Sequence, residues 1–94
     1  MQIKTMDAAH EAATALGINP DVIAPYSPSW TAPTPDDIRA VLKAGNLTGS
    51  AAANLVGVDS RTIRKWTGGE RAIPYAAFAL LLSVVGCGEL WKLK

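Results

Sequence analysis

The chain has 94 residues, of which 49% are hydrophobic and 18% are charged, and its formal net charge is +1. This size and composition predict one ordered globular domain with a single core. Because Cys87 is the only cysteine, an intramolecular disulfide and a cysteine-rich zinc site are excluded.

The first residues, MQIKTMDAAHEAA, contain no apolar signal core. The longest apolar run, AAFALLLSVV, is too short to span a bilayer. We therefore expect no membrane segment and a location in the reducing cytoplasm.

Residues 5–17, TMDAAHEAATALG, predict a short helix with Thr5 as its N-cap and Gly17 at its end. Its apolar stripe is weak and consists of Met6, Ala9, Ala13 and Leu16. The prolines that recur in residues 18–33 then predict a linker or an arm laid on the surface, with one turn at residues 21–23. Residues 1–33 are thus expected to form an N-terminal extension, and Tyr26 and Trp30 are candidates for fastening it to the domain.

The compact domain is predicted to occupy residues 34–94, with helices over residues 34–45, 48–57, 59–68 and 74–86. Thr34, Thr48 and Asp59 are the expected N-caps, Pro74 starts the last helix, and a glycine follows each helix. The predicted core residues are Ile38, Val41, Leu42, Ala52, Leu55, Val56, Ile63, Trp66, Phe78, Leu81, Leu82 and Val85. No strand pattern competes, so the predicted fold class is all-α.

The spacing within residues 49–68, GSAAANLVGVDSRTIRKWTG, is that of a helix-turn-helix. Ala53 stands where the two helices must approach closely, and Gly57 stands where the turn requires a positive φ. The inner face that sets the angle between the helices consists of Ala52, Val56, Val58, Ile63 and Trp66.

Positive charge is concentrated in the same region. Residues 1–33 contain one base and three acids, whereas residues 34–94 contain eight bases and five acids. The bases cluster between Arg61 and Arg71. A local basic patch in a nearly neutral chain is typical of a protein that binds phosphate selectively.

With these positions in place, residues 34–86 resemble the Cro/C1-type (XRE-like) helix-turn-helix of phage and plasmid repressors. Ala53, Gly57 and the apolar positions Val58, Ile63 and Trp66 match that family, and WTGGERAIP matches its usual W-x-x-G-x-R-x-x-P run. The resemblance implies a lambda-repressor-like bundle of four core helices, to which the N-terminal helix and arm are added.

One position departs from the family. Gly49 stands where the family often has a glutamine that contacts a phosphate. Thr48, Ser50 or the helix N-terminus must therefore supply that contact.

The resemblance implies that residues 59–68 form a recognition helix in the major groove of double-stranded DNA. The residues expected to face DNA are Ser60, Arg61, Thr62, Arg64 and Lys65. Arg61 is placed to pair with a guanine, and Arg71 to contact a phosphate. The implied function is a transcriptional regulator, a repressor or autorepressor that occludes its promoter as a homodimer on a near-palindromic operator, in a phage or mobile-element setting.

Other interpretations remain beside this one. The basic run is also compatible with an ordinary solvated helix face, and this fold also serves as a protein-interaction module in antitoxins and phage-encoded inhibitors. The apolar last helix suggests a dimer interface. The extension has three candidate uses, in falling order: packing on the core, a dimer contact, and an arm that follows DNA.

Enzymatic chemistry is not expected. Asp36 and Asp37 are adjacent on a helix and therefore do not face each other. His10 and Cys87 have no partner in the sequence that would make a metal site or an activated nucleophile. We expect no cofactor, no metal and no catalytic residue, and we assign Cys87, Trp30 and Trp91 structural or interface roles.

Overall fold

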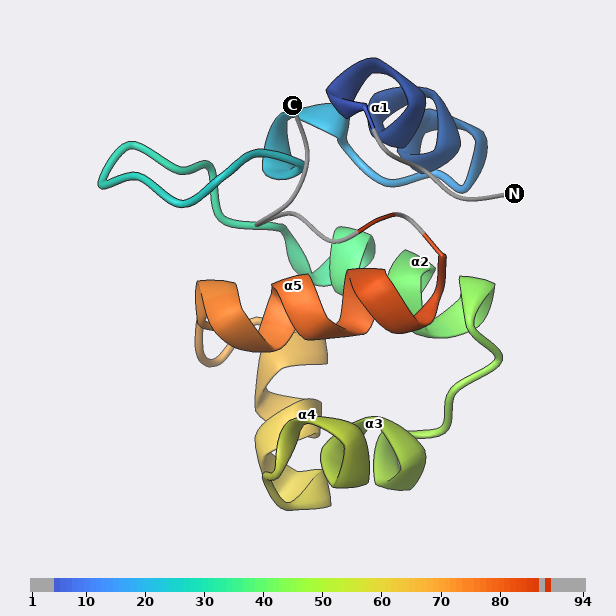
Figure 1. Cartoon of the computed structure of the whole chain (residues 1–94). Helices are drawn as coiled ribbons and strands as arrows, with labels where there is room; N and C mark the ends of the chain where they lie inside the picture. Colours follow the sequence, from blue (N-terminus) through green and yellow to red (C-terminus); the bar gives the residue numbers. More distant parts are fainter. Residues whose placement is uncertain (1–4, 87, 89–94) are drawn as a thin grey trace.

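The computed structural model describes residues 5–86 and residue 88. Every regular element in this part of the chain is a helix (Figure 1). The elements are α1 (Met6–Ala15), the short 3₁₀ helix η1 (Pro20–Val22), α2 (Pro35–Ala44), α3 (Gly49–Val56), α4 (Ser60–Thr67) and α5 (Tyr75–Val84). The predicted all-α fold class is confirmed. The predicted roles of Cys87 and Trp91 lie outside the described residues.

Four helices begin at capping residues that the sequence makes recognisable. The side chains of Thr5, Thr34, Thr48 and Asp59 each accept a hydrogen bond from the backbone N–H three residues further on. Each bond satisfies a donor that has no partner within the helix. The helix α5 differs, because Pro74 precedes it and no side chain caps it.

The helix α5 crosses the middle of the molecule and supplies much of its core (Figure 1). Its side chains Phe78, Leu81 and Leu82 are fully buried. The helices α2 and α3 both pack against α5, and α4 packs against α2 and α3. In the described part of the chain, no helix combines the length and the apolar character that a membrane crossing requires.

Three residues of the segment 18–23 belong to the core, which corrects the prediction of a surface arm there. Ile18, Val22 and Ile23 are at most 2% exposed. The turn predicted at residues 21–23 is present as the 3₁₀ helix η1, which begins one residue earlier, at Pro20, and it carries Val22 into the interior. One hydrophobic cluster therefore contains residues from both sides of residue 34.

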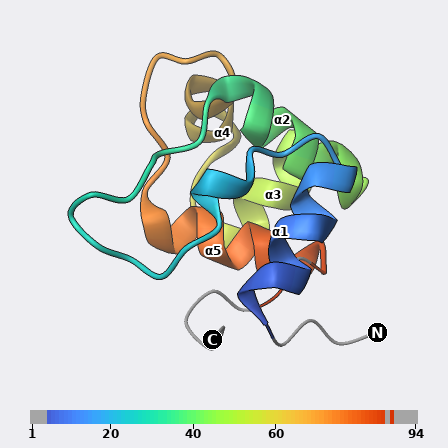
Figure 2. The ribbon, with the colours of Figure 1, turned by 90° about the horizontal axis from the view of Figure 1, so that it is seen from above.

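Two aromatic side chains fasten the following segment to α5. The indole N–H of Trp30 donates to the carbonyl oxygen of Val22 at 3.0 Å, and the Tyr75 hydroxyl donates to that of Ala24 at 2.9 Å. Their rings meet edge to face, with centroids 5.0 Å apart. Burial raises the pKa of the Tyr75 phenol above its ordinary value, so this group stays a donor at alkaline pH as well as at neutral pH. Residues 24–33 form a loop that extends away from the helices (Figures 1 and 2).

Two leucines that the predicted stripes placed inward are exposed instead. Leu16 is 40% exposed and Leu55 is 41% exposed. The helix α1 packs through Ala9 and Ala13, and α3 packs through Ala52 and Ala53. Because alanine allows close approach of the backbones, the longer side chains of these helices are left at the surface.

Gly45 follows α2 because its place leaves no room for a side chain, and not because its backbone needs a positive φ. Its φ is −89°, and the positive φ falls on the next residue, Asn46. A Cβ atom added to Gly45 would lie 2.5 Å from a methyl carbon of Val85. The glycine therefore lets the end of α5 come close to the end of α2.

Asp37 connects the extension to α2. One oxygen of its buried carboxylate accepts from the backbone N–H of Asn19 at 3.0 Å, and the other accepts from that of Thr34 at 2.9 Å. The Thr34 hydroxyl in turn accepts from the Asp37 N–H at 3.2 Å, which completes a reciprocal capping box. The start of α2 and the segment after α1 are thus held by the same side chain.

Asp37→Ala should lower the free energy of unfolding by about 1–3 kcal/mol, because two main-chain N–H groups lose their acceptor. Urea denaturation followed by tryptophan fluorescence measures this change. Asp21→Ala is the matched control, since Asp21 is exposed and its removal should shift stability by under about 0.5 kcal/mol. Equal losses in the two variants would show that total negative charge, and not this bonding, is responsible.

Candidate nucleic-acid interface

The turn between α3 and α4 has the geometry that the spacing predicted. Gly57 adopts a φ of 75°, in the left-handed region that favours glycine. The N–H groups of Gly57 and Val58 both donate to the carbonyl oxygen of Ala53, at 2.9 and 3.0 Å. These bonds close the end of α3. Ala53 itself is buried, so the two helices pack closely as a helix-turn-helix.

The helix α4 divides into a core face and a polar face. Ile63 and Trp66 are each 3% exposed and face the core, as predicted. Among the described residues, the indole N–H of Trp66 has no hydrogen-bond partner. Trp66 therefore anchors α4 through apolar packing, and the rest of the helix is left to face outward.

The outward face of α4 carries the basic side chains. Arg61 and Arg64 are exposed and Lys65 is half-buried. In the described part of the chain the single ion pair joins Arg39 to Asp36, so none of these three side chains is in an ion pair there. Arg71 is exposed, and its backbone N–H donates to the carbonyl oxygen of Lys65. The loop thus folds back and brings Arg71 to the C-terminal end of α4.

The hydroxyl side chains among the predicted site residues gather at the other end of α4. The Ser50 hydroxyl, at the start of α3, lies 3.5 Å from the Ser60 hydroxyl at the start of α4. Thr48 caps α3 through the backbone N–H of Ala51. The N-terminal turns of the two helices therefore lie next to each other at Ser50 and Ser60.

Asp59 acts as the N-cap of α4, as predicted. Its carboxylate accepts from the backbone N–H and from the hydroxyl of Thr62, both at 2.8 Å. These two bonds, and the nearby charges of Arg61 and Lys65, hold the pKa of Asp59 below its usual range. The Thr62 hydroxyl is consequently committed as a donor within the protein and offers only its lone pairs to another molecule.

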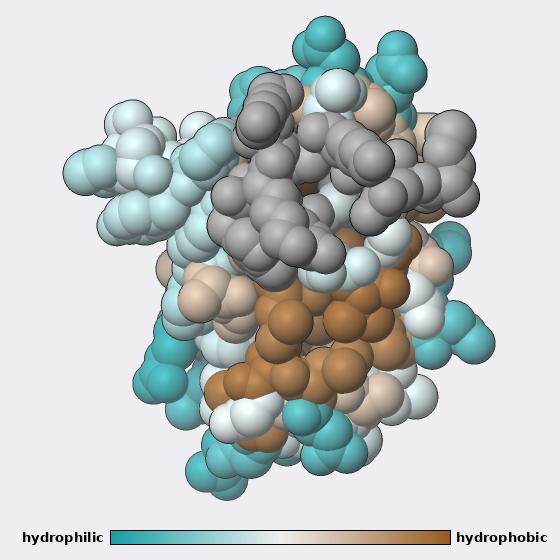
Figure 3. All heavy atoms as spheres, viewed as in Figure 1, coloured by the Kyte–Doolittle hydropathy of each residue, from teal (hydrophilic) through white to brown (hydrophobic). Residues whose placement is uncertain are grey.

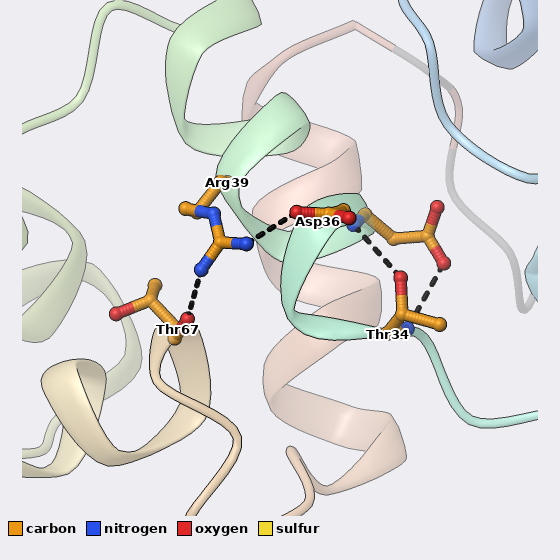
Figure 4. A network of polar contacts seen from close by, with 5 residues as sticks. Thr34, Asp36, Arg39 and Thr67 are labelled. Atoms are coloured by element: carbon orange, nitrogen blue, oxygen red, sulfur yellow. Dashed lines mark hydrogen bonds and ion pairs between the residues drawn. The ribbon is translucent and has the colours of Figure 1, made fainter.

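A contact that sequence reasoning missed lies at the C-terminal end of α4 (Figure 4). The Arg39 guanidinium, on α2, donates to the Asp36 carboxylate and to the main-chain oxygen of Thr67. The Asp36–Arg39 spacing on one helix is a readable signal for an ion pair. The contact with Thr67 joins residues 28 positions apart, and nothing in the local sequence indicates it.

His10 was considered as a possible metal ligand, and its surroundings can be compared with that idea. The described residues contain no group of three His, Cys, Asp or Glu side chains that could hold a metal ion. His10 is bonded through Nε2 to the carbonyl oxygen of Ile23 at 2.8 Å. It therefore ties α1 to the residue after η1.

Comparison with known proteins finds two curated relatives, both named transcriptional repressor protein KorC, from Escherichia coli. Each is 44% identical to this chain over 66 residues, which is 67% of this chain and 78% of the relative. The chain belongs to the KorC family of transcriptional repressors. No family model matches the sequence, and no solved structure matches it.

This membership separates the regulator class from the enzyme class considered above. It places the chain with non-enzymatic regulators and supports a repressor function. The family membership and the helix-turn-helix geometry of α3 and α4 together make the polar face of α4 the candidate functional site.

The low pKa of Asp59 yields a pH-dependent prediction. A depressed folded-state pKa contributes stability that is present above the unfolded value, about 3.9, and is lost as pH falls through the lower folded value. Asp59→Ala should therefore lower the melting temperature relative to the wild type at pH 7. The difference should narrow as the pH falls below about 4.

Thermal melting followed by circular dichroism, between pH 7 and the acid limit of the folded state, measures this narrowing. Asp59→Asn is the control, because its amide oxygen still caps the helix but carries no charge. A difference that remains constant down to the acid limit would show that the ionised carboxylate is not the form that caps α4.

Proposed function

We propose that this protein represses transcription by binding a specific double-stranded DNA site, with α4 in the major groove. The observation that carries the proposal is the division of α4. Its apolar face is fixed in the core by Ile63 and Trp66, and its opposite face presents basic side chains without ion-pair partners in the described residues. A surface helix that only needed solubility would gain from mixed charges, which this face lacks.

Each predicted site residue has a role in this proposal. Arg61, in the first turn of α4, pairs with the N7 and O6 acceptors of a guanine. Arg64 and Lys65, one turn later, reach a further base edge or a flanking phosphate. Arg71 binds a phosphate beside the C-terminal end of the helix.

The hydroxyl residues position the protein on the DNA backbone. Ser50 and Ser60 lie together at the adjacent N-termini of α3 and α4, where backbone N–H groups and the helix dipoles favour an anion. Thr48 borders the same place. In this proposal they supply the phosphate contact that Gly49 cannot make, and Thr62 accepts a hydrogen bond from a base or a bridging water.

Repression by occlusion fits a homodimer whose two copies of α4 enter successive major grooves, about 34 Å apart. The surface over α5 supports such pairing (Figure 3), because it is the broad apolar area on this face of the molecule. Leu80 and Val84, one turn apart on α5, are 38% and 46% exposed. An exposed apolar patch of this kind is typical of an interface.

The test of DNA recognition is a gel-shift experiment on DNA from immediately upstream of the gene, against scrambled DNA of equal length. The wild type should give a discrete shift that weakens steeply as salt rises, because bound phosphates release counterions. Arg61→Ala should reduce the preference for the operator by about 5- to 150-fold, the loss of one bidentate base contact. Lys43→Ala, which removes an exposed base from α2, is the control and should keep the preference.

Two results would contradict this proposal in different ways. An unchanged preference in Arg61→Ala would place the N-terminal end of α4 outside the groove. If the wild type showed no salt-sensitive binding to any duplex, including duplexes selected from a random pool, the protein-interaction alternative would replace the DNA-binding one.

Leu80→Glu should convert the dimer to a monomer, because it places a charge in the apolar patch of each copy. Sedimentation equilibrium measures the mass of each variant over a range of concentrations. Leu16→Glu is the matched control, since Leu16 is equally exposed, at 40%, but lies just beyond α1. A dimer that survives Leu80→Glu and dissociates with Leu16→Glu would assign the interface to the N-terminal extension.

A further inference from the structure

The C-terminal end of α4 depends on a residue from another helix for its last hydrogen bond. The carbonyl oxygens of Arg64, Lys65 and Trp66 accept from backbone N–H groups of residues 68–71. In the described part of the chain, the Thr67 oxygen accepts from the Arg39 guanidinium instead. Arg39 therefore supplies a partner for a carbonyl that the helix itself leaves unpaired.

The geometry of this contact is a bridge between two helices (Figure 4). One nitrogen of the guanidinium binds Asp36, a turn earlier on α2, and another binds the end of α4. Because the guanidinium is planar and its donors are fixed relative to one another, the Asp36 bond sets the direction in which the other donor points. A positive charge at this end also complements the α4 dipole.

The bridge stands at one of two polar junctions that hold α4 to the other core helices in the described residues. At the N-terminal end, Ser60 meets Ser50 of α3. At the C-terminal end the junction is with α2, where the Arg39 guanidinium donates to the Thr67 oxygen. The direction of α4 within the molecule is therefore fixed by contacts at both ends.

Both partners of the Arg39–Asp36 ion pair are largely exposed, so the bridge contributes little to overall stability. The bridge instead affects the orientation of α4. The helix α4 has eight residues and is about 12 Å long, so a displacement at Thr67 tilts the helix and moves the groups at Arg61. Base recognition requires groups to be held within about 0.5 Å of their productive positions.

We propose that Arg39 is a positioning residue for DNA recognition. It fixes the C-terminal end of α4 against α2 and so sets the angle at which Arg61 meets the base edges, without contacting DNA itself. This inference rests on the proposed function, in which α4 reads the operator.

Arg39→Lys is the informative variant, because lysine keeps the charge but lacks the planar fork that makes both bonds. Titrations of the full chain on operator and on scrambled duplexes should show about tenfold weaker operator binding, less than the largest loss expected for a base contact. Binding to scrambled DNA and the salt dependence on both duplexes should stay as in the wild type, since no phosphate contact is lost. Lys43→Arg, the reverse exchange on the same helix, should leave all of these unchanged.

Arg39→Gln separates positioning from direct phosphate contact. If Arg39 binds a phosphate, this variant loses affinity for both duplexes and its salt slope falls by about one; that result overturns the proposal. An operator preference retained within about twofold by Arg39→Lys overturns it as well.

A measurement on the free protein distinguishes failure of this inference from failure of the proposed function. Residual dipolar couplings of the backbone amides report the orientation of α4 relative to α2. The orientation should differ between the wild type and Arg39→Lys, with the melting temperature nearly unchanged. An identical orientation refutes the positioning role, even if the wild type binds no DNA.

Discussion

Both oxygens of the Asp37 carboxylate accept main-chain hydrogen bonds, and this arrangement joins the segment after α1 to the start of α2. A buried carboxylate is costly unless its bonding is complete, so the chain must bring Asn19 and Thr34 to the same side chain. Since α2 packs against both α4 and α5, the place where α2 begins determines where those helices can lie. The N-terminal extension is therefore a component of the fold that presents α4.

The position of α4 on the core follows from the difference between its apolar face and its polar face. In a helix of this length, burial of Ile63 and Trp66 uses nearly all the apolar surface available. Apolar packing is strong but not directional. It sets how deeply α4 is buried and which face of the helix is turned to the core. The polar contacts at its ends, through Ser60 and Thr67, are weak but directional. Depth and direction thus come from different interactions.

The sequence predicts local features well and distant contacts poorly. The caps at Thr34, Thr48 and Asp59 were predictable because a cap and its partner are only three residues apart. The burial of Val22 was not, because prolines around it are typical of linkers and its partners come from other helices. The Arg39–Thr67 contact is hidden for the same reason. The roles of the site residues in binding DNA stay predictions, since they concern a partner molecule.

The distribution of charge reconciles an acidic extension with the proposed DNA binding. Asp7, Glu11 and Asp21 belong to α1 and η1, which lie at the end of the molecule opposite α3 and α4 (Figure 1). The unpaired bases of α4 lie at the other end. Although the net charge of the full chain is only +1, the described residues are therefore more acidic at the α1 end and more basic at the α4 end. In the field of a phosphate backbone this arrangement turns the α4 end inward and the α1 end outward, so acidic residues in the extension favour the orientation that the proposed recognition by α4 requires.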